Sequence, residues 1–286
     1  MRNRSRTIIA GIGLMAILLP VSATTAATPT TVVVLPGDIA TNNTGAAAGK
    51  WLFYNDETDT IDASLGSFVM GPGSPPAGVG SAQISVTGTQ RRNLATYRFS
   101  GTPLASITTL RFSTYNPSAG NGGSANRSGY LHFNVDFNGS DTWQRRLVFV
   151  PSQNGTVIQD QWQEWDAIAA GSAQWVFSGA TWPVTLQPGA TLKTWSQILA
   201  DYPAARIRVT DSFLGVRVGE PYAYGYTENI DRFRFGTASA ETTFDFEPQI
   251  GPPAAKGDCR QGGWAVFNTP TFTSQGDCIQ FVNTGR

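Results

Sequence analysis

The chain has 286 residues, with 20 Lys and Arg against 20 Asp and Glu, so its formal net charge is zero. This balance excludes the basic surface with which a nucleic-acid-binding protein neutralises phosphates, and we expect no nucleic-acid partner. Only 14% of the residues are charged, and the chain contains 31 Gly, 17 Pro and 8 Trp. Such a composition is typical of extracellular β-proteins rather than of cytoplasmic helical ones.

The first 27 residues have the pattern of a bacterial export signal. Arg2, Arg4 and Arg6 give a basic start, an uncharged apolar stretch follows at 8–19, and small residues fill 21–27. The apolar stretch is shorter than the ~20 residues of a bilayer-spanning helix. We therefore predict cleavage after residue 23, 26 or 27 and a secreted, extracellular protein without a membrane span. Loss of the three arginines leaves 17 basic against 20 acidic residues, a net charge of −3.

Short β-like segments separated by turn residues follow from residue 32 to residue 246. Several alternate apolar and polar residues, which is typical of strands with one buried face. The expected strands are 32–35, 51–54, 67–70, 83–87, 95–99, 110–115, 130–137, 147–150, 156–158, 174–177, 206–209, 215–218, 230–235 and 242–246. The segment 192–202 has the spacing of a helix and ends before Pro203. The pattern predicts an all-β fold, an antiparallel β-sandwich of the jelly-roll or concanavalin-like kind with one short helix.

The predicted organisation has four parts: a signal peptide at 1–27, a β-sandwich domain at 28–247, a linker at 248–258 and a Cys-bounded tail at 259–286. Pro and Gly residues mark the linker. Cys259 and Cys278 are the only cysteines, and in an exported chain this pair predicts a disulfide that closes the tail. The absence of a CxxC motif and the presence of a single histidine argue against a zinc site.

The strand at 130–137 and the strand at 147–150 predict a hairpin whose turn contains Asn138, Gly139 and Ser140. Asp136, Asn138, Ser140 and Asp141 have the one-three-five spacing of calcium ligands. No glutamate follows at the twelfth place of that pattern, and the same residue types are also expected in a simple turn. A structural calcium ion is therefore one interpretation of this loop, and a hairpin turn is the other.

The acidic segment Asp56, Glu57, Asp59 and Asp62 is the best candidate for catalysis. Its spacing approaches the paired carboxylates of jelly-roll β-glucanases, which act as nucleophile and acid. The surrounding residues are polar and indicate a loop, whereas catalytic carboxylates need a rigid strand. His132 lies in the middle of a strand without a nucleophile motif, so we interpret it as a residue of the polar face. We therefore expect no enzymatic activity.

Aromatic residues are the candidates for ligand binding, because exposed Trp and Tyr rings stack on sugar faces. Tryptophans cluster in the middle of the chain, and Tyr222, Tyr224 and Tyr226 lie in a loop with Gly and Pro. We choose Trp162 and Trp165 with the three tyrosines, although a Trp in a sandwich is more often part of the core.

Four phrases carry a resemblance to a known group of proteins. They are Trp-Gln-Glu-Trp-Asp-Ala at 162–167, Trp-Ser-Gln-Ile-Leu at 195–199, Glu-Asn-Ile-Asp-Arg-Phe at 228–233 and Thr-Phe-Asp-Phe-Glu-Pro at 243–248. In this order they resemble a group of uncharacterised exported bacterial β-sandwich proteins. The element at 229–233 also resembles the final strand of jelly-roll carbohydrate-binding modules, which often hold a structural calcium, and this resemblance implies Asp231 as a second calcium candidate. The tail resembles a short element that ends many secreted bacterial proteins.

These observations lead us to expect a secreted, non-catalytic module that binds a polysaccharide, a cell-surface glycan or another surface polymer. Two other classes stay open. One is a glycan-active enzyme that uses the cluster from Asp56 to Asp62, and the other is a structural surface protein without a small ligand.

Overall fold

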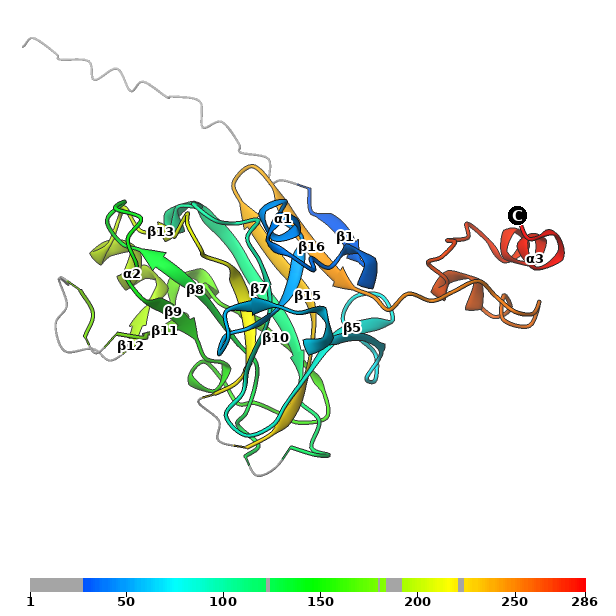
Figure 1. Cartoon of the computed structure of the whole chain (residues 1–286), viewed down its shortest axis with the longest axis horizontal. Helices are drawn as coiled ribbons and strands as arrows, with labels where there is room; N and C mark the ends of the chain where they lie inside the picture. Colours follow the sequence, from blue (N-terminus) through cyan, green and yellow to red (C-terminus); the bar gives the residue numbers. More distant parts are fainter. Residues whose placement is uncertain (1–27, 122–123, 180, 184–191, 221–223) are drawn as a thin grey trace, which may run out of the picture.

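The computed structural model describes residues 28–286, apart from 122–123, 180, 184–191 and 221–223. The predicted signal peptide and Tyr222 therefore lie outside the described residues. Two multistranded, mainly antiparallel sheets pack face to face, and helices are few, so the predicted β-sandwich is confirmed (Figure 1). Within the described residues, no helix is long and apolar enough to cross a bilayer.

One sheet has seven strands and the other has nine. The strands of the first are β1 (Thr30–Val34), β4 (Ser67–Met70), β5 (Gly80–Val86), β7 (Ile107–Tyr115), β10 (Trp162–Asp166), β15 (Tyr226–Thr237) and β16 (Glu241–Phe246). The strands of the second are β2 (Trp51–Asn55), β3 (Thr60–Ile61), β6 (Arg91–Thr96), β8 (Tyr130–Asp136), β9 (Arg146–Phe149), β11 (Gln174–Phe177), β12 (Leu192–Thr194), β13 (Arg206–Ile207) and β14 (Leu214–Gly219).

The α-helices are α1 (Asn43–Ala47), α2 (Trp195–Asp201) and α3 (Gln275–Thr284). Short 3₁₀ helices are η1 (Pro36–Asp38), η2 (Ala63–Leu65), η3 (Leu104–Ser106), η4 (Pro151–Gln153), η5 (Ala169–Gly171) and η6 (Gly263–Val266).

The nine-stranded sheet runs β12-β11-β9-β8-β14-β6-β2-β3, with β13 paired to β8. The seven-stranded sheet runs β1-β16-β15-β5-β4, and β7 also pairs with β15 and carries β10 on its far side. Only β1 and β16 pair in parallel among the described strands. Strands β8, β14, β6 and β2 are therefore neighbours in space although loops of different length separate them in the sequence.

Aromatic side chains fill the space between the sheets. Trp51 of β2 meets Phe233, Phe244 and Phe246 of the opposite sheet edge to face, with ring centroids 4.9 to 5.3 Å apart. These residues occupy alternate strand positions, so the period-two pattern places them on one face. The other face of the nine-stranded sheet carries polar residues and a second, smaller apolar cluster that includes Leu52, Ala95 and Phe213.

Two local expectations were wrong in part. Residues 192–194 extend the sheet as β12, and α2 begins only at Trp195 because Thr194 and Gln197 form a capping box. Residues 156–158 form no strand, and Asn154 instead hydrogen-bonds through its side chain to the backbone N–H and C=O of Gln174. The amide side chain of Asn154 thus takes the place of a backbone partner. The helices α1 and α3 were not expected.

The C-terminal segment has its own small core. Cys259 and Cys278 form the predicted disulfide, with Cα atoms 5.7 Å apart. Both cysteines are buried with Phe272 in an apolar cluster that is separate from the core of the sandwich. In Figure 1 this segment lies to one side of the two sheets, and an extended stretch after β16 connects it to them.

Candidate functional site

A pocket of about 560 Å³ lies on the face of the nine-stranded sheet that is turned away from the other sheet. Its volume is in the range of small-molecule sites. Side chains from β8, β9, β11 and β14 line it, together with residues at the end of β2, at the start of β6 and in the turn between β8 and β9. The pocket therefore combines segments that are far apart in the sequence.

Alternation along β8 decides which of its side chains reach the pocket. Leu131 and Phe133 point into the core, so Tyr130 and His132 point the other way. The strand register places Val148 beside His132 and Arg217 beside Tyr130. The polar face that the sequence predicted for this strand is thus the inner surface of a pocket rather than an open, solvated face.

His132 is buried and neutral. Its Nε2 lies 2.7 Å from Asn93 Oδ1, which also accepts a hydrogen bond from Arg217 Nε at 3.3 Å. Because this oxygen can only accept, the network assigns the proton to His132 Nε2. Burial lowers the pKa of His132 well below its usual value, and the charges of Arg217 and Arg146 lower it further. His132 Nδ1 is consequently an acceptor, and no described residue donates to it.

Asp56 is the anionic centre of the pocket wall. Its side chain is only 3% exposed, and its two oxygens each accept a hydrogen bond of 3.0 Å from the guanidinium of Arg146. Arg217 donates to the same carboxylate. The backbone N–H of Asp56 donates to the carbonyl of Arg91 and holds the residue against β6. Such a buried carboxylate fixes two arginine side chains that would otherwise repel each other.

Trp143 provides an aromatic surface at the pocket. All eight tryptophans lie within the described residues, and only Trp143 is exposed, at 48% of its surface. The guanidinium of Arg146 lies 5.7 Å from its ring centroid and steadies the ring by a cation–π contact. A flat, exposed ring beside hydrogen-bonding groups is the arrangement that stacks on a sugar.

The structure does not bring together the four predicted aromatic residues that it describes. Trp165 of β10 is 6% exposed and donates its indole N–H to Thr114, so it belongs to the core. Trp162 is half-buried, donates to the carbonyl of Pro72 and packs on the ring of Tyr115. Both tryptophans belong to the seven-stranded sheet, away from the pocket.

The tyrosines also differ from one another. Tyr226 is 2% exposed, and its hydroxyl accepts a hydrogen bond from the backbone of Gly219. Tyr224 is 63% exposed, and the guanidinium of Arg127 lies 5.1 Å from its ring centroid. Tyr222 lies outside the described residues. Of the predicted aromatics that the structure describes, Tyr224 is therefore the exposed one.

The loop from Asp136 to Asp141 forms the turn between β8 and β9, and its carboxylates are engaged by protein donors. Asp136 accepts hydrogen bonds from the backbone N–H groups of Asn138, Gly139, Ser140 and Asp141. Despite burial, these bonds and one from an arginine lower the pKa of Asp136 below its usual value.

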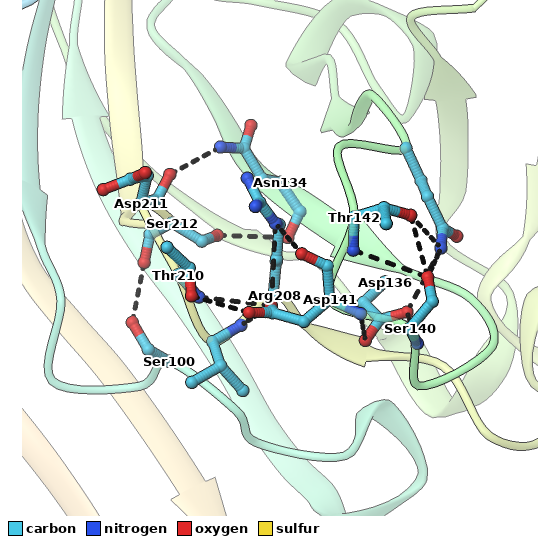
Figure 2. Close-up of polar contacts among 12 residues, drawn as sticks. Ser100, Asn134, Asp136, Ser140, Asp141, Thr142, Arg208, Thr210, Asp211 and Ser212 are labelled. Atoms are coloured by element: carbon cyan, nitrogen blue, oxygen red, sulfur yellow. Dashed lines mark hydrogen bonds and ion pairs between the residues drawn. The ribbon is translucent and has the colours of Figure 1, made fainter.

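Asp136 and Asp141 also connect this turn to the neighbouring segment 206–210. Arg206 donates to Asp136 at 2.9 Å, and Asp141 accepts bonds from the backbone of Val209 and from the backbone and hydroxyl of Thr210. Figure 2 shows Asp141 reaching from the turn to Thr210 and Arg208. The turn interpretation describes this geometry, and a calcium ion here would have to replace these donors. Calcium at this loop stays a prediction.

The second calcium candidate, Asp231, lies in β15 of the other sheet. It is buried with Asp245 and Glu247, and burial raises the pKa of Asp231 to about 7, with a contribution from the charge of Glu247. Burial and the same neighbour raise the pKa of Asp245 to about 7. One oxygen of Asp245 has no hydrogen-bond partner among the described residues. In the part of the chain that the structure describes, no three His, Cys, Asp or Glu side chains are arranged around one metal position.

The acidic segment after β2 is a turn, and its carboxylates have separate partners. Asp56 pairs with arginines, as described, and Glu57 accepts hydrogen bonds from Arg92 and from the backbone of Arg91. Asp59 accepts a bond from the hydroxyl of Tyr54, and Asp62 caps η2. Each of these four carboxylates is thus engaged by a donor of the protein itself.

Sequence reasoning did not identify the arginines of the pocket or the role of Trp143. A signal was present, because Arg217 stands in the centre of the apolar strand Leu214–Gly219, where a charged side chain needs a partner. Trp143 follows a polar turn, where a large aromatic ring has little apolar surface to cover it.

Comparison of the chain with protein-family models, with curated proteins and with solved structures found no match.

Proposed function

We propose that this protein is an exported, non-catalytic module that binds a glycan or another cell-surface polymer in the pocket of its nine-stranded sheet. The observation that carries this proposal is the exposed ring of Trp143 at a pocket of about 560 Å³. The ring offers a stacking surface, and the polar side chains of Arg145, Gln153 and Ser178 line the same pocket.

The partners of the acidic residues argue against the enzyme alternative. A general acid needs a carboxyl group with room for the substrate, whereas Asp56 is enclosed by Arg146 and Arg217. An open pocket with an exposed aromatic ring favours a binding role over a purely structural one.

A glycan-array screen followed by titration tests the proposal. We expect Trp143→Ala to weaken binding about ten-fold or more, since loss of a stacked ring removes more than about 1.4 kcal/mol. Tyr224→Ala is the matched control, because Tyr224 is also exposed but lies outside the pocket. Loss of binding in the Tyr224 variant alone would show that the binding site lies at the loop of Tyr224. Absence of binding to any glycan would refute the proposed function.

Calcium is a second proposal, with Asp231 and its neighbour Asp245 as the candidate ligands, although these two and Glu247 do not surround one metal position within the described residues. Carboxylates buried against one another are stabilised by a cation, and one oxygen of Asp245 is free to accept one. We expect millimolar calcium to raise the melting temperature, because a ligand of the native state stabilises it. The rise should be lost in Asp245→Asn and kept in Asn138→Ala, and the reverse result would favour the turn.

A further inference from the structure

The pocket carries more positive than negative charge. Four arginines and two carboxylates line it, and its histidine is neutral. One of the two carboxylates, Asp56, forms ion pairs with Arg146 and Arg217 and is almost inaccessible to solvent. The other, Glu220, lies at the surface and pairs with Arg91 at 3.3 Å. A ligand that enters this pocket therefore meets guanidinium groups that the protein itself does not fully neutralise.

Arg145 is the clearest of these groups. It is exposed at the pocket, and its guanidinium has no hydrogen-bond or ion-pair partner within the described chain. Its φ angle is +79°, a left-handed conformation that costs free energy for a residue with a Cβ atom. The backbone is held there because the carbonyl of Arg145 accepts a hydrogen bond from Val135. This conformation places Arg145 at the pocket between Trp143 and Arg146.

Arg91 offers a second guanidinium at the pocket. Its side chain is partly exposed, its Nη1 pairs with Glu220 at 3.3 Å, and its buried Nε lies 3.9 Å from the carboxylates of Asp56 and Glu57. The planar fork of a guanidinium matches a carboxylate or a sulfate group with two parallel hydrogen bonds. An acidic substituent is thus the chemical group that matches the unpaired guanidinium of Arg145, with Arg91 lining the same pocket.

We infer that the pocket is specific for an acidic glycan, with the carboxylate or sulfate of a sugar bound by Arg145 and Arg91 and its ring stacked on Trp143. This inference rests on the proposed glycan-binding function and names the ligand class of the same site. The net charge of the mature chain is slightly negative, so the attraction is local to the pocket rather than a property of the whole surface.

Paired polymers test the inference on the full secreted chain. Polygalacturonate is compared with its carboxyl-reduced, neutral form, and dextran sulfate is compared with dextran, by titration calorimetry. We expect the acidic member of at least one pair to bind about ten-fold or more tightly than its neutral partner. The preference should shrink at about 0.5 M NaCl, where charges are screened within a few ångströms. The pair that shows the preference identifies the acidic group.

Two substitutions with opposite expected effects on binding distinguish a change at the binding site from misfolding. Arg145→Gln removes the unpartnered cation and should weaken binding of the acidic polymer about ten-fold, while Glu220→Gln frees Arg91 and should strengthen it. Arg260→Gln, in the C-terminal segment, makes the same charge change as Arg145→Gln and should have no effect. Equal binding of acidic and neutral members, or unchanged binding in Arg145→Gln, would overturn the acidic specificity alone. Failure to bind any polymer here or on a glycan array would instead overturn the proposed function.

Discussion

Glu228 should make the stability of this protein fall as the pH rises. The residue lies in β15 and is fully buried. One carboxyl oxygen accepts a hydrogen bond of 3.2 Å from the hydroxyl of Ser128, and the other has no partner among the described residues. Burial raises the pKa of Glu228 from its usual 4.5 to about 8, against the effect of these hydrogen bonds. The native state therefore keeps a proton that the unfolded chain releases.

The size of the effect follows from proton linkage. Between about pH 4.5 and about pH 8 the native state binds up to one proton more than the unfolded state, so stability decreases by about 1.4 kcal/mol per pH unit. The loss amounts to about 3 kcal/mol between pH 4.5 and pH 7. Asp231 and Asp245 act in the same direction because their pKa values are raised to about 7. The depressed pKa of His132 acts in the opposite direction below pH 6.5.

Because several groups contribute, the test compares the wild type with Glu228→Gln. Urea unfolding at several pH values from about 5 to about 8 gives the free energy of unfolding of each protein. We expect the slope against pH to differ by about 1 kcal/mol per unit, with the variant less sensitive to rising pH.

Glu241→Gln is the matched control for this comparison. Burial disfavours ionisation of Glu241, but bonds from Arg234 and Thr109 outweigh it and hold its pKa below the usual value. Glu241 is thus ionised throughout this window, and its variant should keep the wild-type slope. Parallel curves for the wild type and Glu228→Gln would refute the reasoning.

Three further changes have defined outcomes. Asp56→Ala should destabilise the sandwich by about 3 kcal/mol in urea unfolding, because it leaves Arg146 and Arg217 unpaired. Asp59→Ala is the control and should cost less than about 1 kcal/mol. Equal destabilisation by the two substitutions would contradict the structural role of Asp56. Asp136→Asn should lower the melting temperature even in chelator, since the carboxylate accepts bonds from four backbone N–H groups. Cys278→Ser should make the C-terminal segment sensitive to protease, with about 3 kcal/mol of chain constraint lost, while the sandwich melts as before; a large shift in that melting would show that the two parts are coupled.

The sequence by itself determined most of the strands, the fold class and the disulfide, whereas β3 and β10 were not expected. Apolar alternation is a local property, so segments such as Ser67–Met70 and the hairpin of β8 and β9 could be read directly. Two cysteines leave a single intramolecular pairing. Local capping explains the late start of α2. Thr194 caps this helix, so it begins three residues later than the spacing suggested.

Only the tertiary structure decided the candidate site. Asp56, Arg146 and Arg217 come from three separate segments, and they meet because β9, β8, β14, β6 and β2 are neighbours in one sheet. Alternation shows that a side chain leaves the core, but it does not show whether that side chain faces water or a pocket. The same limit applies to the aromatics, since the sequence does not show which residues of other segments pack against Trp143 and Trp165. Burial and pairing across strands are non-local, and they made Trp165 a core residue and Trp143 a binding candidate.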